Sequence, residues 1–242
     1  MPDPHTARAL FEALRGENAA VLHFALLGAV LGLDVVSFPQ AMISRPLVAA
    51  TLAGAIAGEA GRGLLVGAVL ELVALETLPV GASRYPEWGS AAVVGGALYA
   101  LHPEGAAGAL VLAVTCALAT AFVGGESMIL LRRLNGQLAR AQAPALNRGS
   151  LRSVSLLQFA GLGFDLLRGF ALTVVALSLS LPLLATAVGH WGADARLSRA
   201  VVVSVAATVA GSAVWKLFHL VPRARLLFAA GLAAGLLRLA LQ

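Results

Sequence analysis

One stretch of this sequence, residues 34 to 89, is apolar enough for a membrane and yet carries many charged side chains. The charged residues in it are Asp34, Arg45, Glu59, Arg62, Glu71, Glu76, Arg84 and Glu87. A charge near the centre of a bilayer costs at least about 2.5–3.5 kcal/mol on insertion scales, so such residues usually pair with one another or serve a function. We therefore expect this stretch to contain a binding site.

Glu71 is the charged residue of this stretch with the strongest case for binding a ligand. Apolar residues surround it, GLLVGAVL before it and LVAL after it, and Gly67 lies one helical turn earlier on the same face. Carboxylate and amide oxygens accept hydrogen bonds from sugar hydroxyls, and a few such groups in a concave pocket give specificity. We expect Glu71 and Gln40 to supply these acceptors. The alternative for Glu71, a structural ion pair with Arg45, stays open.

Three further residues complete the candidate substrate-binding set: Arg45, Glu59 and Glu76. Arg45 also fits the start of a helix, because Ser44 before it can act as an N-cap and Pro46 after it suits the first helical position. Glu59 is expected at the tip of a hairpin, where a solvated charge is common. Glu76 is ambiguous between these interpretations.

Motifs for catalysis and for metal binding are missing from the sequence. There is no GxxxxGK[ST] phosphate loop, HExxH or GxSxG, and the five histidines lie far apart in separate segments. The single cysteine, Cys116, cannot form an internal disulfide or a multi-cysteine metal site. We expect no catalytic residue, no metal and no cofactor of the chain's own.

The elements that would position the candidate residues are short. The 13 residues from Pro46 to Gly58 and the 8 from Gly63 to Leu70 carry no charge, whereas a helix needs about 20 apolar residues to cross about 30 Å of hydrocarbon. The sequence between them, GEAGRG, is a turn signal. The pattern predicts a re-entrant helical hairpin. Paired, short, glycine-interrupted segments of this kind point to the binding site of a transporter.

The composition predicts an all-α, polytopic integral membrane protein that contains this re-entrant helical hairpin. The chain is 59% hydrophobic and 12% charged, with a mean hydropathy of +0.87, whereas soluble domains are about 45–50% apolar and about 25% charged. The length allows about six to eight membrane segments. The net charge of +5 comes from arginines in loops, which follows the positive-inside rule and does not indicate nucleic-acid binding.

Four regions follow one another along the chain. Residues 1–19 are expected to form an N-terminal amphipathic segment, and residues 20–131 a membrane bundle that contains the re-entrant hairpin (34–89). Residues 132–152 hold five arginines and no acidic residue, which predicts a cytoplasmic Arg-rich linker. Residues 153–242 are expected to form a C-terminal membrane bundle.

Two expectations within these regions concern single charged residues. Residues 106–125 are long enough for a full span, and Glu126 is expected to end it. Asp165 and Arg168 are three residues apart and share one helical face, so we expect an ion pair between them. We place this pair at the membrane interface, where the two charges neutralise each other.

The hairpin stretch resembles the conserved core of a known family. Its motifs, in order, are Arg45-Pro46-Leu47, Gly58-Glu59, a glycine-rich half-helix from Gly67 to Glu71, Gly81-Ala82, and Pro86-Glu87. This ordered set is similar to the IIC subunit of the mannose-family sugar phosphotransferase systems, whose sugars include mannose, fructose, sorbose and N-acetylgalactosamine. The clear similarity covers residues 30–100 of the chain.

The resemblance implies a multi-pass permease subunit of the bacterial inner membrane. Such a subunit binds and translocates a hexose or amino sugar together with a IID membrane subunit, in a multimeric complex. Cytoplasmic IIA and IIB components carry phosphate from phosphoenolpyruvate on their own histidines, which agrees with the missing catalytic motifs here. The resemblance implies no nucleic-acid partner.

Pro79 departs from the family pattern, which often has Asn just before the Gly-Ala segment. The C-terminal helix also ends early, at Gln242. Both departures leave an alternative open: a regulatory or sensory membrane protein derived from such a subunit, which binds sugar or a partner without transport.

Overall fold

The computed structural model describes residues 20–75, 77, 85–102, 107–218 and 223–241, and within them all regular structure is helical, as predicted. The helices are the first helix (Ala20–Asp34), α2 (Pro46–Ile56), α3 (Ala60–Ala74), α4 (Trp88–Leu101), α5 (Ala107–Ala141), α6 (Ala143–Leu146), α7 (Leu151–Gly189), α8 (Ala195–Phe218) and α9 (Ala224–Ala240). The predicted N-terminal amphipathic segment, Glu76 and Pro79 lie outside the described residues.

Helices α2 and α3 form the predicted hairpin. They have 11 and 15 residues, too few to cross about 30 Å of hydrocarbon. Gly58 turns the chain between them with a φ of +81°, a backbone conformation that glycine adopts at no steric cost. A side chain at Gly63 would lie 2.3 Å from the carbonyl oxygen of Ala50, so glycine is what lets the two helices lie this close.

The start of α2 differs in part from the sequence-based expectation. Pro46 is the first helical residue, as predicted, but the N-cap is Arg45 and it makes no side-chain cap. The predicted N-cap, Ser44, was wrong, because the helix begins at Pro46 and Arg45 occupies the N-cap position. The backbone N–H of Ser44 instead bonds the carboxylate of Asp34. The carboxylate of Glu71 caps this end instead, accepting a hydrogen bond from the N–H of Leu47 (3.1 Å).

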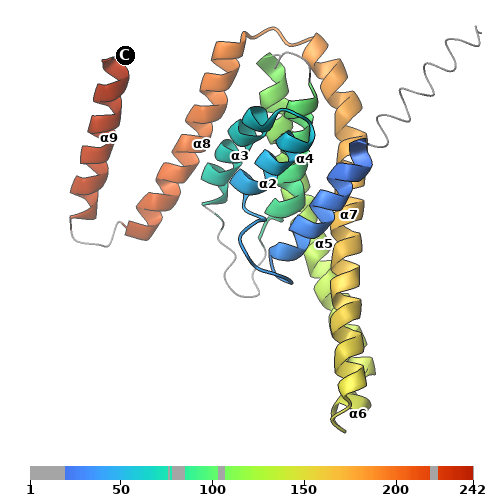
Figure 1. The fold of residues 1–242 in the computed structure, drawn as a ribbon. Coiled ribbons are helices and arrows are strands. Elements are labelled where there is room, and N and C mark those ends of the chain that lie inside the picture. Colours follow the sequence, from blue (N-terminus) through green and yellow to red (C-terminus); the bar gives the residue numbers. More distant parts are fainter. Residues whose placement is uncertain (1–19, 76, 78–84, 103–106, 219–222, 242) are drawn as a thin grey trace, which may run out of the picture.

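Helix α4 is the core of the bundle. Every residue from Trp88 to Ala100 is buried, and the first helix, α2, α3, α5 and α7 surround it (Figure 1). A helix that is apolar all round belongs in such a position. Its small residues let the neighbours approach: a side chain at Gly96 would lie 2.5 Å from the carbonyl oxygen of Ala50 in α2.

Helices α5 and α7 continue past the rest of the bundle and meet at α6 (Figure 1). Glu126 was expected to end the span of residues 106–125, and this expectation was wrong, because α5 runs on to Ala141. A charge ends an apolar run without breaking a helix, and the polar residues that follow remain good helix formers. Much of the Arg-rich segment 132–152 therefore belongs to the far ends of two long helices.

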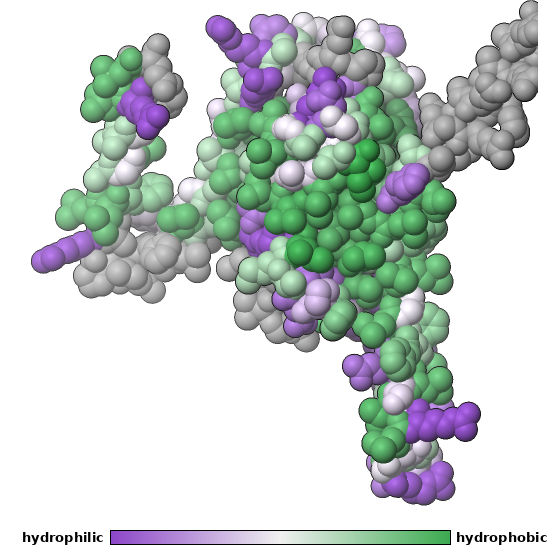
Figure 2. Space-filling model, in the orientation of Figure 1, coloured by the Kyte–Doolittle hydropathy of each residue, from purple (hydrophilic) through white to green (hydrophobic). Residues whose placement is uncertain are grey.

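The surface of the bundle is that of a membrane protein. Among the described residues, three helices are long and apolar enough to cross a bilayer: Gly108–Ala141, Leu151–Gly189 and Ala195–Trp215. Figure 2 shows hydrophobic residues over the middle of the molecule and hydrophilic residues gathered toward its two ends. Helix α9 stands apart from the bundle (Figure 1), and Phe228 in it meets the edge of Trp215 in α8.

Candidate functional site

A cavity of about 390 Å³ opens where the first helix ends and where α2 and α4 begin. Its lining residues are Asp34, Val35, Gln40, Met42, Ser44, Arg45, Pro46 and Trp88. Two predicted site residues, Gln40 and Arg45, thus lie at one cavity. The volume falls near the lower end of the range of about 300–1,000 Å³ that is typical of small-molecule sites.

Asp34 shapes one wall of this cavity. Its carboxylate accepts hydrogen bonds from the backbone N–H groups of Ala41 (2.6 Å) and Ser44 (2.9 Å), and its side chain is buried. These bonds fold residues 35–45, which we call the cavity loop, back over the end of the first helix. An acid at the end of an apolar run was visible in the sequence, but its backbone partners were not.

Gln40 sits in this loop with an unusual backbone. Its φ is +58° and that of Met42 is +62°, values that cost a residue with a side chain about 1–2 kcal/mol. Non-glycine residues in this region cluster at functional sites. The side-chain N–H of Gln40 donates to the carbonyl oxygen of Val36 (2.7 Å). The amide oxygen makes no hydrogen bond to the described residues and is available as an acceptor.

Arg45 and Glu71 form an ion pair beside the cavity. The Nε of Arg45 donates to Oε1 of Glu71 at 2.7 Å, and a second guanidinium nitrogen bonds the same oxygen. This is the arrangement that the sequence left open as the alternative to a binding role for Glu71. Glu71 does not line the cavity itself. It bonds Arg45, which does, and so acts on the cavity through that side chain.

The other two predicted site residues lie elsewhere. Glu59 is the N-cap residue of α3 at the tip of the hairpin, where it pairs with Arg62 (3.7 Å). This position is at the far end of α2 from the cavity. Glu76 lies outside the described residues.

Trp88 contributes a buried, unsatisfied polar group to the cavity. It is the first residue of α4, its side chain is 8% exposed, and its Nε1 has no hydrogen-bond partner among the described residues. An unsatisfied buried donor costs about 1–3 kcal/mol. The sequence prediction missed this residue. The available signal was a tryptophan directly after the Pro86-Glu87 motif, in a chain with three tryptophans.

A cluster of buried charged side chains adjoins the cavity loop. Asp165 and Arg168 in α7 form the predicted ion pair (2.9 Å), and at 1% and 8% exposure their side chains lie inside the bundle. The helices around α7 exclude solvent from them. Ser37 of the cavity loop donates a hydrogen bond to Asp165, and Ser127 of α5 contacts Arg168 (3.3 Å).

Glu87 completes this charge cluster. It is 1% exposed, accepts a hydrogen bond from the N–H of Ser90 at the start of α4 (3.1 Å), and interacts electrostatically with Arg168 and Asp165. Gly124 of α5 makes room for it, because a side chain there would lie 2.7 Å from Cβ of Glu87. The cluster therefore joins α4, α5, α7 and the cavity loop.

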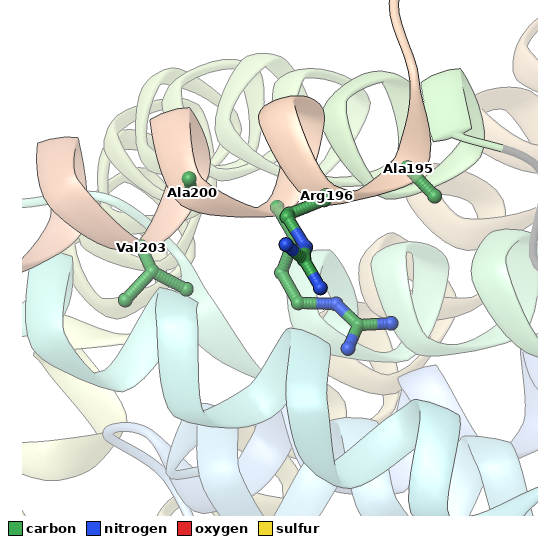
Figure 3. A pocket seen from close by; sticks show the side chains of 5 residues that line it. Ala195, Arg196, Ala200 and Val203 are labelled. Carbon is green, nitrogen blue, oxygen red and sulfur yellow. The ribbon is translucent and has the colours of Figure 1, made fainter. Parts of the chain in front are cut away.

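A second cavity, of about 550 Å³, lies along the beginning of α8 (Figure 3). The residues that line it are Ala195, Arg196, Arg199, Ala200 and Val203, and Arg196 projects from the helix into it. Two guanidinium groups with no acceptor side chain suit an anion and not a neutral sugar. None of the predicted site residues lines this cavity, whereas Gln40 and Arg45 line the first one, which we therefore take as the candidate site.

Comparison with known proteins identifies the family. Residues 19–200 match the family described as the sorbose-specific IIC component of the phosphotransferase system. The chain belongs to this family. The match covers the cavity loop, the hairpin, α4 and the charge cluster, so the site described above lies within the part of the chain that defines a IIC protein.

Named relatives agree with this membership. The chain is 28% identical over 137 residues to the sorbose-specific EIIC component of Klebsiella pneumoniae, covering 57% of this chain and 49% of the relative. It is 27% identical over 135 residues to the mannose-specific EIIC component of Escherichia coli (strain K12), covering 55% and 49%. It is 27% identical over 159 residues to the fructose permease IIC component of Bacillus subtilis (strain 168), covering 64% and 56%. The chain thus spans about half the length of these relatives.

The fold is also found in a solved structure titled "Structure of membrane protein". The two share a TM-score of 0.70 at 18% identity, and the match covers 92% of this chain and 91% of the other. This likeness supports the arrangement of the helices over nearly the whole chain.

Proposed function

We propose that this IIC protein is the membrane permease subunit of a phosphoenolpyruvate-dependent sugar phosphotransferase system. It binds a hexose or amino sugar and translocates it across the bacterial inner membrane, coupled to phosphorylation of the sugar by partner subunits. The observation that carries the proposal is the cavity itself: in a chain of this family, it brings Gln40 and Arg45 together with Asp34 and Trp88.

The chemistry of the cavity suits a neutral sugar. Gln40 offers a free amide oxygen and Trp88 a free N–H, which pair with a sugar hydroxyl from either side. The charge of Arg45 is neutralised by Glu71, and Asp34 adds a negative charge, so the cavity does not favour anions. We assign the sugar-binding role to Gln40, Arg45 and, through Arg45, Glu71; Glu59 and Glu76 remain predictions.

The partners are proposed from the family. A IID membrane subunit completes the permease in a multimeric complex, and cytoplasmic IIA and IIB components supply the phosphate. Relatives named for sorbose, mannose and fructose define the sugars to be tested first.

Reconstitution tests the proposal. The chain is placed in proteoliposomes with its IID subunit, IIA and IIB are supplied with the phosphoenolpyruvate-dependent phosphocarriers, and uptake of labelled sugars is measured. We expect uptake that needs both phosphoenolpyruvate and this chain, with the sugar recovered as its phosphate. Sugar binding without uptake would instead support the regulatory or sensory alternative, and neither binding nor uptake of any sugar would overturn the proposal.

A further inference from the structure

The three tryptophans of this chain differ in how their indole N–H groups are satisfied. Trp191 donates to the hydroxyl of Ser198 at 3.1 Å, and Trp215 is 44% exposed. Trp88 is buried at the cavity and its N–H has no hydrogen-bond partner among the described residues. Buried tryptophans usually find a partner for this group, so the exception at Trp88 requires an explanation.

The chemistry of the indole restricts what the missing partner can be. The Nε1–H group only donates, so its partner is an acceptor such as a hydroxyl, ring or carbonyl oxygen. A phenylalanine would supply a similar ring without an unsatisfied donor. At the cavity, the carboxylate of Asp34 accepts hydrogen bonds from backbone N–H groups, and the guanidinium of Arg45 is itself a donor. Among the described residues no acceptor bonds the N–H of Trp88, so the acceptor that we seek is an oxygen of a ligand in the cavity.

We propose that Trp88 is a specificity-determining residue of the sugar site. Its N–H donates a hydrogen bond to an oxygen of the bound sugar, and its ring packs against the apolar C–H face of the pyranose or furanose ring. This inference rests on the proposed function, because it names a residue of the same site. Together with the free amide oxygen of Gln40, it gives the cavity one donor and one acceptor for recognising the position of particular hydroxyls.

The net charge around Trp88 also defines the class of ligand. The Asp34 carboxylate adds a negative charge to the neutralised Arg45–Glu71 pair. A sugar phosphate carries a charge of about −1.5 to −2 near neutral pH and would be repelled. The ligand that Trp88 recognises is thus the unphosphorylated sugar.

The test is equilibrium binding of labelled mannose, fructose, sorbose and N-acetylgalactosamine to the purified chain in complex with IID. We expect Trp88→Phe to keep the fold and to weaken binding of the preferred sugar by about tenfold, the effect of one lost neutral hydrogen bond. A series of monodeoxy analogues should contain one that binds wild type and Trp88→Phe equally, because it lacks the oxygen that Trp88 contacts. Trp191→Phe, which changes an indole outside the cavity, is the matched control and should leave the affinity unchanged.

A second measurement uses the native tryptophan. In the double variant Trp191→Phe/Trp215→Phe, Trp88 is the remaining tryptophan, and adding the preferred sugar should change its emission with the same Kd as the binding assay. Emission unchanged at saturating sugar, or equal affinity of wild type and Trp88→Phe for every analogue, would overturn the role of Trp88 while the proposed function stands. Failure of every sugar to bind the wild type would overturn the proposed function.

Discussion

At the scale of single residues, the cavity is built from groups that satisfy one another around a small number of free ones. Asp34 holds the loop through two backbone N–H groups, and Arg45 is held by Glu71. The indole N–H of Trp88 and the amide oxygen of Gln40 have no hydrogen-bond partner among the described residues, and both residues line the cavity. Pre-organised polar groups of this kind give specificity because their positions do not depend on the ligand.

Gln40→Gly separates two effects at this position: the conformational strain of the backbone at positive φ and the role of the side-chain amide in binding. Glycine relieves about 1–2 kcal/mol of strain at positive φ and costs about 0.5–1 kcal/mol in flexibility of the unfolded chain. We expect an unchanged or slightly raised unfolding temperature and sugar affinity at least fivefold lower. Met42→Gly is the control, since its φ is also positive and its side chain offers no amide. Equal loss of affinity in both variants would contradict the role of the Gln40 amide.

Glu71→Gln tests the ion pair beside the cavity. The change weakens a charge-assisted bond to Arg45 and leaves that guanidinium without its counter-charge, so we expect about 1–2 kcal/mol less stability and at least tenfold weaker sugar binding. Both are measured on purified protein in detergent, by thermal unfolding and by equilibrium binding. Arg148→Gln, which removes an exposed charge next to α6, should change neither. Unchanged sugar affinity in Glu71→Gln would show that the pair is structural alone.

At the scale of helices, α4 and its neighbours place the cavity. Three helices pack here with their backbones in contact. Gly96 of α4 and Gly63 of α3 both lie against the carbonyl oxygen of Ala50 in α2. The beginning of α4 thereby lies near the beginning of α2, and Trp88 and Arg45 both line the cavity. Small residues at helix crossings produce such close packing in membranes.

Gly96→Ala is expected to disrupt this packing. A methyl group there would lie 2.5 Å from a backbone oxygen of α2, so the helices must separate, and overpacking of this kind costs about 1–3 kcal/mol. Gly61→Ala in α3 is the matched control, because nothing lies within 4 Å of its added carbon, and it should be neutral or slightly stabilising. Thermal unfolding in detergent compares the two, and equal stability of both variants would contradict the packing.

Arg168→Gln tests the buried charge cluster. The change leaves Asp165 and Glu87 buried without their cation, and removing one partner of a buried pair costs about 3–5 kcal/mol. We expect little folded protein, with partial recovery in Arg168→Lys. Arg140→Gln, which removes an exposed arginine near the end of α5, should behave as wild type. A stable Arg168→Gln variant would show that the cluster does not hold the helices together.

Much of this arrangement could be predicted from sequence. The short lengths of the uncharged runs and the turn sequence GEAGRG were enough to predict the hairpin, because both are local properties of the chain. The Arg45–Glu71 pair was foreseen as an alternative, since few countercharges are available nearby. The burial of Asp165, Arg168 and Glu87 in one cluster was not foreseen, because it depends on which helix faces meet. Trp88 was missed for the same reason: its unsatisfied N–H exists only once α4 is packed.

At the scale of the whole molecule, the long helices determine which ends face which side of the membrane. Helix α7 has 39 residues and is about 58 Å long at 1.5 Å per residue, so its ends lie on opposite sides. We propose that the end near α6 faces the cytoplasm, because the arginines there follow the positive-inside rule. In this proposed topology the segment between α7 and α8 faces the outside.

Cysteine labelling checks this orientation. In a Cys116→Ala background, we introduce Gly192→Cys between α7 and α8 or Asn147→Cys next to α6, both exposed, and treat spheroplasts with a membrane-impermeant maleimide. We expect labelling of Gly192→Cys in intact spheroplasts and of Asn147→Cys only after permeabilisation. The reverse pattern would contradict the proposed topology.

The most direct test of the central claim is to locate the bound sugar. The complex with IID is irradiated in the presence of a diazirine-bearing derivative of the sugar that binds best, and the modified peptides are identified by mass spectrometry. We predict labelling within residues 34–46 and at the start of α4, removed by excess free sugar. Sugar-competed labelling confined to the cavity of Arg196 and Arg199, or no competed labelling in either segment of the first cavity, would contradict the account.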